Sequence, residues 1–486
     1  MTDRGFDLVA AARQEMIGEG FDPDFSPEAG RQLAQLKTSR ASTPEAGVRD
    51  LRSLLWSSID NDTSRDLDQA EAAERVAAGI RVLIAIADVD GDVPKGSPID
   101  KHAAAQTTSV YTGIQTFPML PEQLSTDLTS LNENADRLAM VVDMVVAPGG
   151  SIASGSIYRA LVRNRAQLTY NGVGPWLEGR SAAPSKVAAS ADLAAQLKLQ
   201  DEAAQLLFEE RQRLGALNID RVEAEPIITD GQVEGIDTRK KNRATELIEN
   251  FMVAANGVMA RTLMQAGVSS IRRVVRTPER WQRIVDLAAR YGDKLPQEPD
   301  SGALNLFLQE RKASDVVHYP DVSLAVIKLM GPGEYVLSRP GDKDQAHFAL
   351  AAQDYTHSTA PNRRFADTVT QRLIKAVLSK QPPPYSDQQL DSIAQNCTQK
   401  EDAARKVERV MNKRIAAVAL QHRIGETFAA VVTGVTPKGV FVRISSPPAE
   451  GLLARGQQGV DVGDQLQVKL VSTDPQRGYL DFARQG

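Results

Sequence analysis

Apolar residues recur at helix-like spacing at the start of the chain, over residues 7–19 and 27–39. Ser26-Pro27-Glu28 has the composition of a helix cap and first turn, and a third short helix is expected over residues 44–55. Three short helices predict a small helical module over residues 1–49. Such a module is either a helix-turn-helix or winged-helix unit, whose usual role is nucleic-acid contact, or a helical cap on the domain that follows.

The pattern then changes to a long block of mixed character. The block opens with a strand-like apolar run over residues 82–87. Strong helical periodicity follows near residues 190–215, 243–265, 362–379 and 387–422. We therefore predict a mixed α/β domain over residues 50–424.

From Gly425 the chain shows short alternating apolar runs that are broken by Gly, Pro and Asp. The runs cover residues 428–432, 439–442 and 466–470, and their spacing predicts a small all-β barrel over residues 425–486. The predicted fold class is a multidomain α+β protein with a small helical module, a mixed α/β domain and a C-terminal barrel.

Length and composition bound the class of protein. At 486 residues the chain is too long for one compact core, and its 42% hydrophobic and 24% charged residues are ordinary for a soluble globular protein. The sequence starts without a basic leader and apolar core, and no apolar run reaches the roughly 18 residues that span a bilayer. The single cysteine, Cys397, excludes intramolecular disulfides and a cysteine-based zinc site. We expect a cytoplasmic protein without membrane association.

The net charge and the local basic clusters point in opposite directions on whether the protein binds nucleic acid. The net charge of −5 argues mildly against a nucleic-acid partner, since nonspecific binding depends on neutralising phosphates. Three basic clusters argue for one, although each cluster alone is more often a solvated face. They are Arg239, Lys240, Lys241 and Arg243, then Arg272, Arg273 and Arg276, and finally Arg363 and Arg364.

Carboxylates are concentrated in the loop from Asp60 to Asp68, ahead of the strand-like run. So many like charges repel one another unless a cation offsets them. Mg²⁺ takes oxygen ligands and, where it keeps open positions, bridges phosphate oxygens and activates water for in-line attack. The loop is therefore a candidate catalytic magnesium site.

Two other interpretations of this loop stay open on motif content. One is a calcium-binding EF-hand loop, although Arg65 stands where that loop needs glycine and the chain leads on into a strand rather than a helix. The other is a solvated, Asp-rich turn. The residues at EF-hand positions 1, 3, 5, 7, 9 and 12 are Asp60, Asp62, Ser64, Asp66, Asp68 and Glu71.

A series of ordered motifs follows the acidic loop. They are Ile84-Ala85-Ile86-Ala87-Asp88-Val89, Gly96-Ser97-Pro98-Ile99-Asp100, Ser109-Val110-Tyr111, Pro118-Met119-Leu120-Pro121, Asp136-Arg137-Leu138-Ala139-Met140, Arg165-Ala166-Gln167-Leu168-Thr169-Tyr170, Glu246-Leu247-Ile248-Glu249 with Ala255-Asn256, and the segment from Tyr355 to Asp367. In this order they resemble the ribonuclease II/ribonuclease R family, over about nine-tenths of the chain from roughly Leu51. The terminal barrel resembles an S1-type RNA-binding domain of the OB class.

The resemblance implies an overall activity. Family members are processive 3′→5′ exoribonucleases that use Mg²⁺, thread single-stranded RNA into a deep channel and release 5′-monophosphates. On this basis residues 50–424 are expected to form an RNB catalytic domain, and residues 425–486 an S1 domain with an OB fold.

The resemblance also assigns the catalytic centre. Asp60, Asp66 and Asp68 match three of the family's four acidic metal-site positions, and Asp68 matches the position expected to be most sensitive. Arg363 matches the catalytic arginine, whose planar, permanently charged fork suits the scissile phosphate. Arg364 is expected to contact RNA beside it.

Three further residues are expected to contact the RNA. Tyr111 matches an aromatic residue that packs on the 3′-terminal nucleotide. Glu408 matches a glutamate near the 3′-end pocket, and we count Tyr111 and Glu408 with the catalytic set. Glu249 is expected to accept a hydrogen bond from a ribose 2′-hydroxyl, which would favour RNA over DNA.

Two departures from the family pattern carry their own expectations. Gln69 stands where a further aspartate is usual, so this metal ligand is expected to be a weaker amide oxygen, with a higher Mg²⁺ requirement. The N-terminal helices stand where relatives carry two cold-shock barrels, so a more open channel is expected to admit duplexes with a short 3′ overhang. The alternative function is a catalytically weakened RNA-binding protein of the same fold.

Overall fold

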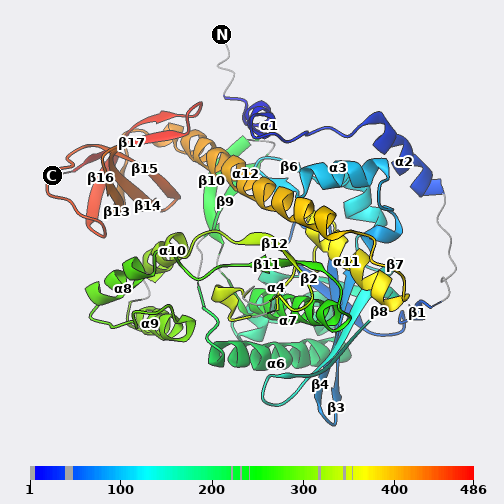
Figure 1. Ribbon diagram of the computed structural model, residues 1–486. Helices are drawn as coiled ribbons and strands as arrows, with labels where there is room; N and C mark the ends of the chain where they lie inside the picture. The colour runs from blue at the N-terminus through cyan, green and yellow to red at the C-terminus, as the bar shows by residue number, and fades with distance from the viewer. Residues whose placement is uncertain are drawn as a thin grey trace.

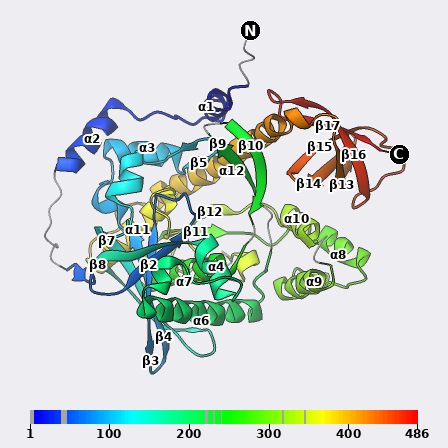
Figure 2. The same ribbon diagram turned by 180° about the vertical axis from the view of Figure 1, so that it is seen from behind.

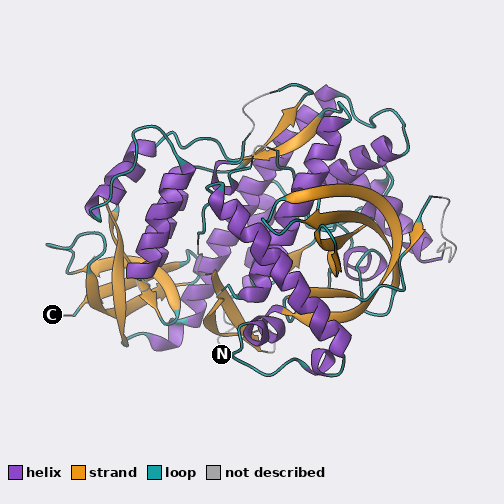
Figure 3. Cartoon of the chain, turned by 90° about the horizontal axis from the view of Figure 1, so that it is seen from below, coloured by secondary structure: helices purple, strands orange, loops and turns teal. Residues whose placement is uncertain are grey.

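A six-stranded sheet lies at the centre of the computed structural model, which describes residues 6–38, 47–219, 223–229, 232–239, 241–315, 319–342, 346–352 and 354–485. The strand order is β1-β8-β2-β3-β4-β7, and β7 also pairs with β8, so the sheet curls back on itself (Figure 3). The strands are β1 (Arg49–Asp50), β2 (Trp56–Asp60), β3 (Gln69–Val76), β4 (Gly79–Ala87), β7 (Asp136–Val146) and β8 (Ile152–Thr169).

Strand β4 contains the apolar run predicted over residues 82–87, and it is buried on both faces. Val82, Ile84 and Ile86 join the core under the helices, whereas the alternate residues from Leu83 to Ala87 face the inside of the curled sheet. A strand covered on both faces needs a continuous apolar run rather than an alternating one. This requirement explains why the run stands out in the sequence.

Two long helices, α6 (Ala191–Arg213) and α7 (Arg243–Gln265), cover one face of the sheet (Figure 1). Helix α7 is buried on most sides and packs against α6, α4 (Tyr170–Leu177) and α11 (Phe365–Leu378). The predicted helices over 190–215, 243–265 and 362–379 are confirmed within a few residues. Short α5 (Ser185–Ala188) precedes α6.

Helix α12 (Asp387–Ala419) is 33 residues long and connects the sheet region to the C-terminal barrel (Figure 1). Five strands form that closed barrel in the order β13-β14-β15-β17-β16. They are β13 (Thr427–Thr436), β14 (Gly439–Ser445), β15 (Pro448–Arg455), β16 (Gln465–Asp474) and β17 (Tyr479–Arg484). The end of α12 contributes Ala416 and Ala417 to the barrel core, and Leu420, which follows the helix, joins them. The predicted fold class, a mixed α/β domain followed by an OB-like barrel, is confirmed.

The N-terminal helices do not form a compact three-helix module. Helix α1 (Leu8–Gly18) packs on α12, whereas α2 (Pro27–Thr38) packs on α3 (Pro98–Gln106), so each covers a different part of the chain (Figure 1, Figure 2). The structure therefore shows the helical-cap alternative rather than a helix-turn-helix unit.

The third helix expected over residues 44–55 is wrong. Residues 44–46 lie outside the described residues, and residues 47–55 hold a turn and strand β1. Arg49 and Asp50 pair in parallel with β8, opposite Ala160 and Leu161. Pairing with a long neighbouring strand decides the local structure here, and helix-like spacing cannot report such a neighbour.

Three helices form a group with its own hydrophobic core. They are α8 (Trp281–Arg290), α9 (Ser301–Ser314) and α10 (Tyr319–Met330). The remaining described strands form two-stranded sheets. They pair β5 (Val110–Tyr111) with β6 (Thr116–Phe117), β9 (Glu223–Thr229) with β10 (Gln232–Arg239), and β11 (Ser270–Val274) with β12 (Glu334–Ser338). Among the helices of the described ranges, none combines the length and apolarity needed to cross a bilayer.

Glu71 of β3 is a carboxylate in the apolar core and supports a stability prediction. The residue is 0% exposed, burial raises the pKa of its carboxyl well above the usual range, and neither oxygen has a hydrogen-bond partner among the described residues. Glu71→Met keeps the length of the side chain and removes both polar atoms. We expect a gain of about 1–3 kcal/mol in the free energy of unfolding, measured by chemical denaturation in metal-free buffer.

Glu74→Met is the matched control, because Glu74 lies on the same strand at the surface, paired with Arg81. Its free energy of unfolding should change by no more than about 0.5–1 kcal/mol. A Glu71→Met protein that is less stable than the unmodified chain would contradict the prediction.

Candidate active site

The acidic loop leaves the sheet at the end of β2 and re-enters it at the start of β3. These strands are antiparallel with Ser57 opposite Glu71, and continuing that register brings Asp60 opposite Asp68. Asp60 Oδ1 accepts hydrogen bonds from the Asn61 N–H at 2.7 Å and the Ser64 hydroxyl at 3.0 Å. The short polar side chains of the loop therefore stabilise its own turn.

The EF-hand interpretation fails on this geometry. Ser64 donates to Asp60, the Asp62 carboxylate accepts a hydrogen bond from the Asn171 amide, and Glu71 lies in the core. The chain continues into β3 instead of an exiting helix. An EF-hand needs these side chains to converge on one ion, so the calcium alternative is not supported.

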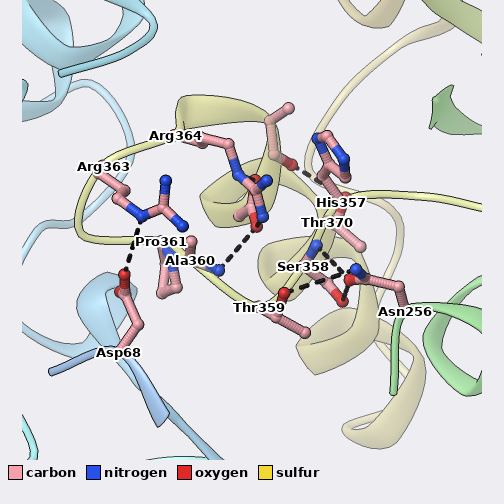
Figure 4. Close-up of polar contacts among 12 residues, drawn as sticks. Asp68, Asn256, His357, Ser358, Thr359, Ala360, Pro361, Arg363, Arg364 and Thr370 are labelled. Atoms are coloured by element: carbon pink, nitrogen blue, oxygen red, sulfur yellow. Dashed lines mark hydrogen bonds and ion pairs between the residues drawn. The ribbon is translucent and has the colours of Figure 1, made fainter. Parts of the chain in front are cut away.

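Asp68 is buried at the meeting point of two distant segments. Its side chain accepts a hydrogen bond from the Asn362 N–H at 3.0 Å. Arg363 Nε lies 3.6 Å from the other carboxylate oxygen of Asp68 (Figure 4). Burial raises the pKa of Asp68 to about 7, with Arg363 opposing the shift and Asp66 adding to it. The carboxyl is thus held in a place where a cation would stabilise its charged form.

Asn256, a buried residue of α7, holds the segment from Tyr355 to Asp367, which carries Asn362 and Arg363. Asn256 Oδ1 accepts hydrogen bonds from the Ser358 N–H at 2.8 Å and the Ser358 hydroxyl at 2.7 Å (Figure 4). Its amide nitrogen donates to the Tyr355 hydroxyl at 3.3 Å. In the sequence Asn256 stands out only as part of a motif and as a polar residue among apolar neighbours on a predicted helix.

Arg363 and Arg364 are adjacent, yet they have different environments. The Arg363 side chain is 44% exposed and faces Asp68, as expected of a residue that contacts substrate. Arg364 makes a bidentate contact with Asp367 at 2.9 and 2.7 Å, and the Asp367 side chain is 0% exposed. The structure does not support the expected RNA contact of Arg364, because its guanidinium stabilises the start of α11.

Tyr111 and Glu408 lie beside the acidic loop. The Tyr111 hydroxyl donates a hydrogen bond to Asp66. The backbone N–H of Tyr111 lies 3.5 Å from Glu408 Oε1. Tyr111 is 41% exposed, so a face of the ring is open to a ligand. Burial, Asp66, Asp68 and Asp60 together raise the pKa of its hydroxyl despite nearby Arg363. The structure thus brings Tyr111 and Glu408 together with the predicted metal ligands.

A cavity of about 390 Å³ adjoins Glu408, between α12 and the C-terminal barrel. Basic and amide side chains of α12 line one wall, and strand β15 lines the other. A strand of nucleic acid approaching the acidic loop from the barrel would meet these cations. The α12 side chains are Arg405, Arg409, Asn412 and Lys413.

Helix α1 packs against the part of the site that contains Tyr111 and Glu408. Its apolar face packs with Val110, which precedes Tyr111, and with Phe117, which pairs with Val110 across β5 and β6. It also packs with residues of α12 on either side of Glu408. Arg414 of α12 also pairs with Glu15 at 3.2 Å. The hydrophobic contact therefore fixes Tyr111 and Glu408 relative to each other. The buried α12 residues of this core are Ala404, Val407, Met411 and Ile415.

Two predicted site residues, Gln69 and Glu249, have contacts outside this group. The Gln69 amide nitrogen donates to the Ile59 carbonyl at 3.3 Å. The expected role of Gln69 as a metal ligand stays a prediction. Glu249 pairs with Lys241 at 2.7 Å on the exposed part of α7, and its contact with a ribose stays a prediction.

The donor chemistry at Asp60, Asp66 and Asp68 fits a magnesium ion. Over the described ranges, no three Asp, Glu, His or Cys side chains converge closely enough to chelate an ion by themselves. Mg²⁺ does not require such convergence, because it usually takes one or two carboxylates and completes its shell with water and substrate phosphates. Burial and the charge of Asp60 raise the pKa of Asp66 against the effect of Arg363, so an added cation would relieve repulsion in this loop.

Both large parts of the chain match known families. Residues 48–380 match the RNB domain, and residues 426–485 match the RNase II-type exonuclease C-terminal S1 domain. The expectation of an RNB domain followed by an S1 domain is confirmed.

Two bacterial relatives are similar to this chain over most of its length. Ribonuclease R 1 of Lactococcus lactis subsp. lactis (strain IL1403) is 28% identical, over 99% of this chain and 61% of the relative. Ribonuclease R of Thermotoga maritima is 29% identical, over 94% of this chain and 68% of the relative. This chain therefore spans about two thirds or less of the length of these relatives.

A solved structure has the same fold over almost the whole chain. Mycoplasma genitalium RNase R in complex with double-stranded RNA superposes with a TM-score of 0.86 and 25% identity. The match covers 99% of this chain and 83% of that one. The relative placement of the RNB domain and the barrel is thus shared with a protein whose structure contains RNA.

The two neighbouring arginines should respond differently to substitution. Arg364→Met leaves the buried Asp367 carboxylate without its cation, so we expect a loss of about 3–5 kcal/mol in the free energy of unfolding. Arg363→Met removes a half-exposed cation and should change stability by no more than about 1 kcal/mol. Urea denaturation of both proteins tests this difference, and equal losses would contradict it.

Proposed function

The chain belongs to the RNB domain family and carries an RNase II-type S1 domain, and from this we propose that it is a 3′→5′ exoribonuclease. The observation that carries the proposal is the contact between Asp68 and Arg363, with Tyr111 and Glu408 beside it. Together they offer a metal-binding carboxylate, a cation for phosphate and a stacking surface for a terminal base.

The proposed reaction is hydrolysis of the last phosphodiester bond of an RNA strand. Water attacks the phosphorus, the bond to the 3′-oxygen breaks, and a nucleoside 5′-monophosphate leaves while the shortened strand keeps a 3′-hydroxyl. A Mg²⁺ ion held by Asp68 with Asp60 and Asp66 would lower the pKa of that water and polarise the phosphate. Repetition of the step without release of the strand gives processive degradation to mononucleotides.

The side chains around the scissile phosphate have separate roles in this proposal. Arg363 presents a permanent positive charge and planar donors, which stabilise charge on the phosphate oxygens in the transition state. Asn256 holds the segment of Arg363 in place through Ser358. Pre-organisation of this kind lowers the cost of reaching the transition-state geometry.

The 3′-terminal nucleotide occupies the space next to Tyr111. Its base stacks on the open ring face, which is sequence-tolerant and contributes about 1–3 kcal/mol. The hydrogen bond from the Tyr111 hydroxyl to Asp66 fixes the ring against the metal-binding loop. Glu408 and Glu249 are proposed to contact the ribose, where a 2′-hydroxyl can donate to a carboxylate.

The rival function is an RNA-binding protein whose catalysis has weakened at Gln69. The contact between Asp68 and Arg363 argues against this rival, because it does not involve Gln69. Asp60, Asp66, Asp68 and Arg363 are all present.

Degradation of a 5′-labelled oligoribonucleotide in Mg²⁺ tests the proposed activity. We expect a ladder that shortens from the 3′ end and a loss of at least about 10³-fold in rate for Asp68→Asn, since the transition state loses its main anionic ligand. Asp62→Asn is the control in the same loop, because Asp62 points to Asn171 and not to Arg363. Binding without cleavage by the unmodified protein would favour the rival function.

Duplex tolerance is a further part of the proposal. Helices α1 and α2 cover the catalytic domain at separate places, and Mycoplasma genitalium RNase R has been solved with double-stranded RNA. We expect a duplex with a short 3′ overhang to be degraded past the junction, at no less than about a tenth of the single-strand rate if junction opening costs no more than about 1.4 kcal/mol. A gel that shows arrest several nucleotides before the duplex would contradict this expectation.

A further inference from the structure

A second cavity of about 370 Å³ lies away from the acidic loop, between α6, α7 and the turn that joins β7 to β8. Its remaining wall is the segment that leads into Tyr355. Most of its walls are apolar, and the volume lies in the range of pockets that hold small ligands. The apolar walls include Ile152, Leu207, Val253, Ala254 and Leu350.

Unpaired polar atoms are placed around this cavity. Arg211 Nε and Nη1 are buried and have no hydrogen-bond partner within the described part of the chain, and the same holds for Asn250 Oδ1. Asn250 is 2% exposed. Buried donors and acceptors are normally satisfied, so unpaired atoms that line one cavity offer hydrogen bonds to a ligand there.

A second arginine adds to the positive charge of the cavity. Arg261 lines the same wall, and a Cβ atom at Gly257 would lie 3.1 Å from its Nη1, so the glycine leaves room for the guanidinium. Glu210 pairs with Arg213 at 2.6 Å. Asp354 lies 3.8 Å from Arg272 and also interacts electrostatically with Arg261.

The hydrogen-bond donors of Arg211 and Arg261 indicate which class of ligand the cavity can bind. A guanidinium offers parallel N–H groups that match a phosphate or carboxylate, and two arginines favour a dianion over a monoanion. The apolar walls require that the ligand also has a flat or apolar body. Asn250 can accept one hydrogen bond from that body.

We propose that this cavity binds a nucleoside 5′-monophosphate, with the phosphate on Arg211 and Arg261 and the nucleoside against the apolar walls. The identification of the ligand rests on the proposed function, since hydrolysis from the 3′ end releases this class of molecule. The cavity is separate from the acidic loop, and its ligand is a product of the reaction rather than the RNA strand.

The location of the cavity connects it to the active site. Tyr355 forms part of its wall and is also the first residue of the segment that Asn256 holds and that carries Arg363. The Tyr355 carbonyl accepts a hydrogen bond from the Arg273 N–H at 2.9 Å, which fixes the segment at that end. A ligand in the cavity therefore contacts the base of the catalytic segment.

Calorimetric titration of AMP into metal-free Asp68→Asn protein tests the proposal without any turnover. We expect saturable binding of AMP, at least tenfold weaker binding of inorganic phosphate, and no measurable binding of adenosine. Arg211→Met or Arg261→Met in the same background should weaken AMP binding about tenfold or more, because each removes a charge-assisted contact.

Lys198→Met is the matched control on α6, where Lys198 is exposed and lies 5.8 Å over the Trp176 ring. Its affinity for AMP should equal that of the parent. Thermal unfolding checks that each variant is folded, and the two arginine variants provide independent tests. Absence of AMP binding, equal binding of phosphate and AMP, or AMP binding unaffected by both arginine variants would overturn the proposal. Failure of the RNA ladder assay alone would overturn the enzyme function and leave the binding result intact.

Discussion

The contact of Asn362 and Arg363 with Asp68 is the interaction on which the active site depends. It joins the acidic loop to a segment almost three hundred residues later in the chain, and it holds the Asp68 carboxyl in a buried position. A buried carboxylate is costly unless donors or cations surround it. The hydrogen bonds of Asn256 and Asp367 therefore matter, because they hold the segment that supplies those donors.

Packing of helix α1 also stabilises the active site. Helix α1, which is remote in sequence from α12, shares a core with the β5–β6 pair and with α12, and this core lies directly behind Tyr111 and Glu408. The curled sheet fixes the acidic loop, α7 fixes the arginine segment, and α12 fixes the edge next to the barrel. Three rigid elements thus meet at one site, which is the arrangement that pre-organised chemistry requires.

Buried charge has two different uses in this molecule. Arg364 and Asp367 satisfy each other and stabilise the start of α11, whereas Arg211 and Asn250 have buried atoms without partners at a cavity. A satisfied pair is structural, whereas unpaired polar atoms that line a cavity can bind a ligand. Glu71 also has unpaired oxygens, but it lies in the apolar core and not at a cavity. Asp68 differs from both, because it lies beside Arg363 at the proposed metal site.

The sequence by itself determined the elements with strong periodicity, such as α6, α7, α12, β4 and the barrel strands, because burial of an apolar face imposes that spacing. It also determined the identity of the acidic loop, Tyr111 and Arg363, through motifs in a fixed order. Only the tertiary structure decided where each polar side chain points. Strand β1 replaced the helix expected near residue 50 because β8 offers hydrogen bonds to it. Arg364 stands next to Arg363 in the motif, but its guanidinium pairs with Asp367. The cavity at Arg211 is formed by segments far apart in the chain, so no local pattern could predict it.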